Sequence, residues 1–160
     1  LGVFYIAFLG GFLVAMRTGF DNVAGLSTHL LAYFFLVLFG SDVGAYFAGR
    51  ALGKHKLAPA ISPGKTVEGL IGGIAAAAGF AALATWWFFP ELPYAWSIPL
   101  ACVLALVGVL GDLFESAIKR GAGAKDAASI LPGHGGFLDR LDSLLFGAPI
   151  LYYFARFYFY

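Results

Sequence analysis

The sequence predicts an all-α fold, a polytopic transmembrane bundle of about five to six helices. Two observations support this prediction. Hydrophobic residues make up 61% of the 160 residues and charged residues only 12%, whereas charged residues are about a quarter of a soluble domain. The mean hydropathy is +0.85, and long apolar runs alternate with short polar segments. The chain therefore has the composition of a membrane protein, with residues 1–160 forming a single transmembrane domain.

Five apolar runs are the predicted helices, at residues 1–16, 29–49, 70–89, 98–116 and 144–160. Helices are favoured over barrel strands because the runs are long and uniformly apolar, without the alternation of a barrel strand. The chain is apolar from Leu1, without a basic segment or a small-residue cleavage site, so we expect a truncated start with further helices upstream, not a signal peptide.

The charged segments between the runs predict the topology. Residues 50–68 and 119–140 carry most of the Lys and Arg, whereas residues 89–96 contain Glu91 and no basic residue. By the positive-inside rule, both basic segments face the cytoplasm and the acidic turn faces outward. We expect a multi-pass protein of the plasma (inner) membrane, with its active site on the cytoplasmic side.

Two sequence features bear on packing and on excluded functions. The pairs Gly40/Gly44, Gly49/Gly53 and Gly69/Gly73 have the small-xxx-small spacing that lets transmembrane helices approach closely. The net charge of +1, with basic residues only in short clusters, argues against a nucleic-acid partner. Cys102 is the only cysteine, which excludes a disulfide framework and a cysteine zinc site.

Carboxylates at the edges of the spans are the first candidates for a functional site. Asp42, Asp112 and Glu115 lie within or at the end of apolar runs, where a charge needs a partner or a water-filled cavity. Asp112, Glu115, Ser116 and Lys119 have helical i, i+3, i+4 and i+7 spacing, so they share one helix face.

Asp139 and Asp142 form a second acidic group, at the predicted start of the last helix. Capping of that helix is one interpretation of the pair. It does not explain Asp112, which lies on a different helix. Carboxylates converging from two helices suit Mg²⁺, which shares its coordination shell with substrate phosphates. The residues thus favour a phosphate-bearing substrate.

The segment between these acids fits an anion. Lys119, Arg120 and Lys125 offer cations, and Gly133, Gly135 and Gly136 let backbone N–H groups approach phosphate oxygens. A basic segment that holds lipid headgroups is an equal alternative on these residues alone.

Two stretches resemble a known family. Residues 116–142, SAIKRGAGAKDAASILPGHGGFLDRLD, resemble the signature of the phosphatidate cytidylyltransferases, also called CDP-diacylglycerol synthases. Residues 40–69, GSDVGAYFAGRALGKHKLAPAISPGKTVEG, resemble the block that precedes it in that family. The two blocks and the spans between them cover most of the chain, which looks like the C-terminal portion of such an enzyme.

The resemblance implies a reaction in which CTP and phosphatidic acid give CDP-diacylglycerol and pyrophosphate, with membrane lipids around the enzyme. It implies a Mg²⁺ centre on Asp112, Asp139 and Asp142, and a second cation, Mg²⁺ or K⁺, is left open. The catalytic residues would be these three acids with Lys119 and Arg120, which would contact phosphates. Substrate-binding residues implied by the resemblance are Ser41, Asp42, Lys65, Thr66, Glu68, Glu115, Ser116, Lys125, Asp126, His134, Gly135, Gly136 and Arg140.

Within that set, Ser41, Asp42, Lys65, Thr66 and Glu68 would complete the nucleotide end of the pocket. His134 would either donate to a phosphate or fix the glycine turn. The oligomeric state is undetermined, with a homodimer as one option.

Three other functions have some support in the sequence or in the expected membrane location. GKT at residues 64–66 is similar to a P-loop, but Pro59 occupies the position of the required earlier glycine. The chain also lacks the DGxxAR and GxxxDxxxD segments of CDP-alcohol phosphotransferases. An ion-coupled transporter that uses the intramembrane carboxylates stays the alternative from a different class.

Overall fold

The computed structural model of the protein describes residues 2–20, 25–121 and 142–160. This part of the chain contains five helices and one short hairpin. The elements are α1 (Gly2–Thr18), α2 (Leu26–Leu52), β1 (Lys56–Ala58), β2 (Ser62–Thr66), α3 (Val67–Trp87), α4 (Tyr94–Gly121) and α5 (Asp142–Phe159). Each predicted apolar run corresponds to one helix, so the all-α fold class is confirmed.

Three helices in the described residues, α2, α3 and α4, are long and apolar enough to cross a membrane, and Ile6–Thr18 is a shorter apolar helix. The protein is therefore a membrane protein. Of the five predicted crossings, those of α2, α3 and α4 are supported by length and composition.

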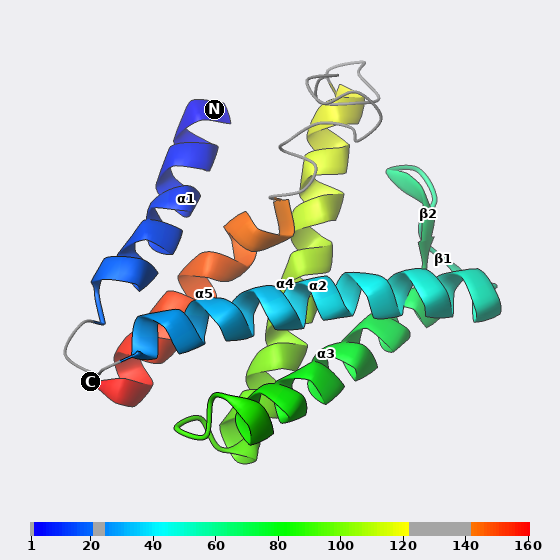
Figure 1. Ribbon diagram of the computed structural model, residues 1–160. Helices are drawn as coiled ribbons and strands as arrows, with labels where there is room; N and C mark the ends of the chain where they lie inside the picture. The colour runs from blue at the N-terminus through cyan, green and yellow to red at the C-terminus, as the bar shows by residue number, and fades with distance from the viewer. Residues whose placement is uncertain (1, 21–24, 122–141) are drawn as a thin grey trace, which may run out of the picture.

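The helices α2 and α3 lie side by side and form the most extensive packing in the molecule, while α4 crosses them (Figure 1). A Cβ added at Gly44 would fall against the Ala76 side chain and the Gly72 carbonyl, and one added at Gly72 would fall against Ala48. Close approach of the two backbones therefore depends on glycine, as the small-xxx-small spacing predicted.

The remaining helices complete the bundle around a buried core. The helix α4 also packs against α5, and α5 packs against α1. Fully buried side chains from all five helices of the described residues, among them Phe34 of α2, Leu104 of α4 and Leu151 of α5, form one continuous cluster. This cluster fixes α4 and α5 relative to the α2–α3 pair.

The hairpin was not predicted from the sequence, which indicated only a basic connection between two helices. The strands β1 and β2 pair antiparallel, with Lys56 opposite Thr66 and Ala58 opposite Ser62, and the register is irregular between Lys56 and Ala58. Polar side chains, Pro59 and Pro63 hide the alternation that marks a strand. The hairpin stands beside the end of α2 and the start of α3 (Figure 1).

Candidate functional site

A cavity of about 350 Å³ lies where the base of the hairpin meets four helices. Its size falls within the range of small-molecule sites, about 300–1,000 Å³. Residues from α2, the hairpin, α3, α4 and the start of α5 surround it. They are Asp42, Ala45, Tyr46, Leu57, Gly64, Lys65, Thr66, Gly69, Leu70, Gly108, Val109, Asp112 and Ser143.

An ion pair between the hairpin and α4 is the main polar contact of this cavity. Lys65 Nζ lies 2.6 Å from Asp112 Oδ2, and the two side chains are 20% and 40% exposed. The same ammonium donates to the Val109 carbonyl at 3.4 Å, and Ser116 Oγ donates to Asp112 Oδ1 at 3.4 Å. Both oxygens of Asp112 thus have a partner, and the side chain as a whole is still partly exposed in the cavity.

Local structure places Lys65 at this point. Thr66 is the N-cap of α3 with an extended backbone, and its hydroxyl accepts a hydrogen bond from the Gly69 N–H at 3.1 Å. Threonine is a favoured N-cap because its side-chain oxygen satisfies one of the free amides of the first turn. The cap fixes the junction between β2 and α3, and Lys65 is the residue immediately before it.

The structure shows what surrounds the acids that the sequence places at the edges of the spans. Asp42 lines the cavity, and Glu115 is only 3% exposed with Lys119 Nζ 3.7 Å from its Oε1. The contacts of Ser116 with Asp112 and of Lys119 with Glu115 agree with the predicted common face of α4. Each acid therefore has the partner or the solvated cavity that a charge at this depth requires.

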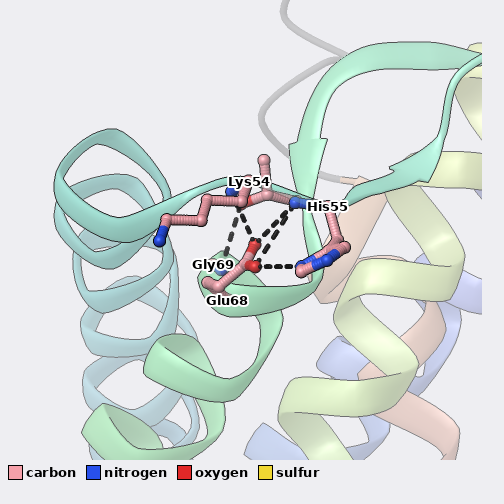
Figure 2. Close-up of polar contacts among 5 residues, drawn as sticks. Lys54, His55, Glu68 and Gly69 are labelled. Atoms are coloured by element: carbon pink, nitrogen blue, oxygen red, sulfur yellow. Dashed lines mark hydrogen bonds and ion pairs between the residues drawn. The ribbon is translucent and has the colours of Figure 1, made fainter.

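Glu68 lies differently from the other predicted residues of the nucleotide end. Its carboxylate accepts the backbone N–H groups of Lys54, at 3.1 Å, and His55, at 3.2 Å, and its Oε1 is 2.7 Å from His55 Nδ1 (Figure 2). Glu68 does not line the cavity. It joins the first turn of α3 to the chain that enters the hairpin.

Other predicted residues are dispersed. Ser41 is buried and faces Gly73 in the α2–α3 interface, and Arg120 is exposed in the last turn of α4. Several predicted residues, together with the side chain of Asp142, which begins α5, lie outside the described part of the chain. They are Lys125, Asp126, His134, Gly135, Gly136, Asp139 and Arg140.

Sequence reasoning missed several residues that line the cavity. Tyr46 follows Asp42 by one helical turn, and Gly108 precedes Asp112 by one turn. The i, i+4 neighbours of an acid at the edge of a span share its face, so this spacing could have identified both. Ser143 carried no comparable signal.

The cavity contains two of the acids that could take part in holding a metal ion. Among the described residues, no group of three or more His, Cys, Asp or Glu side chains could hold an ion. The cavity does present two carboxylates, on Asp42 and Asp112, and oxygen donors of this kind suit Mg²⁺. A complete set of ligands would need acids from elsewhere in the chain.

Comparison with known proteins identifies the relatives of this chain. The model of a family described as the cytidylyltransferase family matches residues 1–158. A phosphatidate cytidylyltransferase of Bacillus subtilis is 46% identical over 137 residues, which are 84% of this chain and 51% of that protein. One of Brucella suis is 46% identical over 156 residues, 96% of this chain and 55% of the relative.

A Staphylococcus aureus protein of the same name is 43% identical over 148 residues, 91% of this chain and 55% of its own length. The chain thus spans about half the length of the curated relatives that it matches. The resemblance drawn from the two sequence blocks is confirmed. None of these matches supports a transporter.

Proposed function

The chain belongs to the cytidylyltransferase family, and on that premise we propose that it forms the catalytic part of a phosphatidate cytidylyltransferase. The substrates would be CTP and phosphatidic acid, and the products CDP-diacylglycerol and pyrophosphate. The relatives that carry this name share more than two fifths of their aligned residues with the chain, over most of its length. The names of these relatives indicate the reaction, and we propose the cavity as the site where it occurs.

The contact between Lys65 and Asp112 is the observation that carries this proposal. Lys65 belongs to the first of the two stretches that resemble the family, and Asp112 lies next to the second. The fold joins them in one cavity with a cation and carboxylates side by side. A site for two phosphate-bearing substrates needs cations to offset the repulsion between their anionic oxygens, and it needs carboxylates if one of those cations is a metal ion.

The chemistry needs positioning and charge stabilisation more than proton transfer. An ionised oxygen of phosphatidic acid attacks the α-phosphorus of CTP, a new P–O bond forms, and the bond from the α-phosphorus to pyrophosphate breaks. The leaving pyrophosphate takes the electron pair of that bond. Because the attacking oxygen is already ionised at neutral pH, a general base is not required. Lys65, with Lys119 and Arg120, would orient phosphate oxygens and balance their charge.

We propose Mg²⁺ as the cofactor, held by Asp112, Asp139 and Asp142, with a second cation, Mg²⁺ or K⁺, as an option. The ion, when bound, would act as a Lewis acid on the phosphate oxygens. Asp112 would contribute one carboxylate from α4, and Ser116 would orient it through the hydrogen bond to Oδ1. Outer-shell hydrogen bonds of this kind fix the direction of a ligating carboxylate.

The location of the cavity suits a substrate with a polar headgroup and apolar tails. It lies at the hairpin end of the apolar helices α2, α3 and α4, where water and hydrocarbon would meet. Lys65 lies in the first basic segment, residues 50–68, and Asp112 lies shortly before the second, residues 119–140. We therefore propose that this end faces the cytoplasm of a bacterial inner membrane.

The test is incorporation of radiolabelled CTP into lipid by the intact protein in vesicles that contain phosphatidic acid, with and without Mg²⁺. We expect Mg²⁺-dependent formation of CDP-diacylglycerol, reduced about 10²-fold or more by Asp139→Asn because a ligand charge is lost. Full turnover by Asp139→Asn would show that the assignment of the metal ligands is wrong. Ion movement across the vesicle membrane without any CTP-dependent product would instead support the transporter hypothesis.

A further inference from the structure

The base of the β1–β2 hairpin is joined to α3 by the chain itself on the β2 side and by hydrogen bonds to one carboxylate on the β1 side. Lys54 and His55 immediately precede β1, and their N–H groups both donate to Glu68 in the first turn of α3 (Figure 2). The His55 ring adds a contact of 2.7 Å to the same group, and Val67 N–H donates to the His55 carbonyl at 2.9 Å. The entry to β1 is therefore tied to the start of α3.

This attachment matters because the hairpin has little stability of its own. Its strands contain three and five residues, and their register is irregular between Lys56 and Ala58. An isolated two-stranded hairpin is at best marginally stable in water. Its geometry must therefore be imposed by contacts with the helices.

The hairpin geometry in turn determines the position of Lys65. Thr66 pairs with Lys56 across the two strands and also caps α3. The cap and the pairing with Lys56 both fix Thr66, which follows Lys65, and the pairing of Ser62 with Ala58 holds the strand before it. Because β1 begins directly after the residues that Glu68 binds, a loss of those bonds would release β1 and, through the pairing, Lys65.

We propose that Glu68 is a positioning residue, which fastens the base of the hairpin to α3 and so fixes Lys65 beside Asp112. The inference deepens the proposed function, on which its last step rests, since Lys65 is there a group that contacts phosphate. It also reassigns Glu68, which the resemblance placed at the nucleotide. The Glu68 carboxylate accepts hydrogen bonds from Lys54 and His55, and Glu68 is not among the residues that line the cavity.

The chemistry of the contacts requires a carboxylate. An ionised carboxylate only accepts hydrogen bonds, so it can receive two backbone N–H groups and an imidazole N–H together. A glutamine in its place has one accepting oxygen, and its NH₂ group cannot accept. Glu68→Gln should therefore keep part of the attachment, and Glu68→Ala should lose it.

The first test follows the attachment without reference to activity. Hydrogen–deuterium exchange of the intact protein in lipid nanodiscs is compared for wild type, Glu68→Gln, Glu68→Ala and the control Glu91→Ala, which removes a carboxylate from the α3–α4 turn. We expect amides of residues 54–66 to exchange about tenfold faster in Glu68→Ala, with Glu68→Gln intermediate, because opening of the hairpin base becomes local and frequent. Core amides of α3, such as Ala77, should match wild type, and so should residues 54–66 of the Glu91→Ala protein, because Glu91 contacts His29 and not the hairpin.

Acetylation of Lys65 by a water-soluble anhydride, read by mass spectrometry, reports on the amine itself. In the wild type the ammonium is paired with Asp112 and 20% exposed, so it should react slowly. Glu68→Ala should raise its reactivity severalfold, whereas the reactivity of Lys56, which is already exposed, should change little. Unchanged exchange in residues 54–66, or unchanged Lys65 reactivity, would overturn the proposal.

A double-mutant cycle then separates positioning from direct contact with substrate. We expect Glu68→Ala to lower kcat/KM for CTP about tenfold, as misplacement of a binding group does. In a Lys65→Ala background it should cause no further loss, because effects transmitted through one residue are not additive. If the two losses multiply, Glu68 acts on substrate by itself and the proposal is wrong. If the wild type forms no lipid product, the proposed function fails, while exchange and acetylation still decide whether Glu68 positions Lys65.

Discussion

The two ends of α3 both carry polar contacts, but those contacts differ in kind. At the N-terminal end, they involve charged groups that remain partly exposed. Lys65 is 2.6 Å from Asp112, and Glu68 binds His55 and its neighbour. Lys65 and Asp112 line a cavity of about 350 Å³, so a ligand in the cavity would meet charged groups.

At the C-terminal end, hydroxyl groups donate to main-chain carbonyls in the interior. Tyr33 donates to the Ser97 carbonyl, Ser97 to the Ala81 carbonyl at 3.2 Å, and Thr85 to the Leu92 carbonyl at 3.1 Å. All three donors are buried. They join α2, α3 and α4 with neutral hydrogen bonds that leave little capacity for a ligand.

The comparison distinguishes polar groups that stabilise helix packing from polar groups that a substrate could contact. Neutral hydroxyls that are fully paired in the interior contribute to helix association. Charges held in a solvated cavity are costly to place at this depth and contribute little to stability when partly exposed. The N-terminal end of α3 is thus the end where we expect substitutions to change activity, and the C-terminal end is the one where they should change stability.

The largest effect should come from Lys65→Ala. This substitution removes the ammonium from the cavity and leaves Asp112 with the hydrogen bond from Ser116. We expect kcat/KM for CTP to fall about a hundredfold, the usual loss when one charge-stabilising donor is removed from an active site. The midpoint of thermal unfolding should change little, because the pair is partly exposed.

The control for that variant is Lys56→Ala. Lys56 lies in the same hairpin, and its side chain is exposed and does not line the cavity. It should retain nearly wild-type incorporation of CTP. Equal activity of both variants would remove the functional distinction between the two ends of α3.

Most of the fold followed from the sequence because the apolar runs are long and sharply bounded. The boundaries were less accurate. The helix α4 continues to Gly121, beyond the predicted end at residue 116, because backbone hydrogen bonding continues where the side chains become polar. The hairpin could not be predicted, since residues 56–66 include two prolines, Pro59 and Pro63, and show no clear alternation.

The site was predicted less completely than the fold. Helical spacing correctly grouped Asp112 with Ser116 and Glu115 with Lys119, because these contacts lie within one helix. The contact between Lys65 and Asp112 joins segments that are distant in sequence, and only the packing of α3 on α4 creates it. Glu68 lies only three residues after Lys65, yet it contacts Lys54 and His55 and not the cavity. This difference could not be inferred without knowledge of the hairpin.

A moderate effect on stability should follow from Gly44→Ala in the α2–α3 interface. Asp42 and Ala45, which line the cavity, lie on α2 next to this glycine. The added methyl group would fall against Ala76 and the Gly72 carbonyl, and overpacking of this kind costs about 1–3 kcal/mol. The free energy of unfolding in detergent should fall by that amount. Some loss of activity should accompany it as the two helices separate.

The control for this interface is Gly79→Ala, on the outer face of α3. A Cβ at Gly79 would meet nothing within 4 Å, so stability should be unchanged or slightly higher, because alanine restricts the unfolded chain more than glycine does. A similar loss in both variants would mean that glycine flexibility, and not close packing, governs the α2–α3 pair.

The smallest effect should come from Tyr33→Phe, at the C-terminal end of α3. The ring would still fill its buried position, and only the hydrogen bond to the Ser97 carbonyl would be lost. A neutral hydrogen bond between helices contributes about 1 kcal/mol, so thermal unfolding in detergent should begin a few degrees lower, with kcat/KM for CTP unchanged. Tyr94→Phe, which makes the same change at a side chain that is 48% exposed, should match wild type. If Tyr33→Phe lowered activity and left stability intact, the C-terminal end of α3 would belong to the functional site, because a contact that only holds helices together cannot alter turnover without altering unfolding.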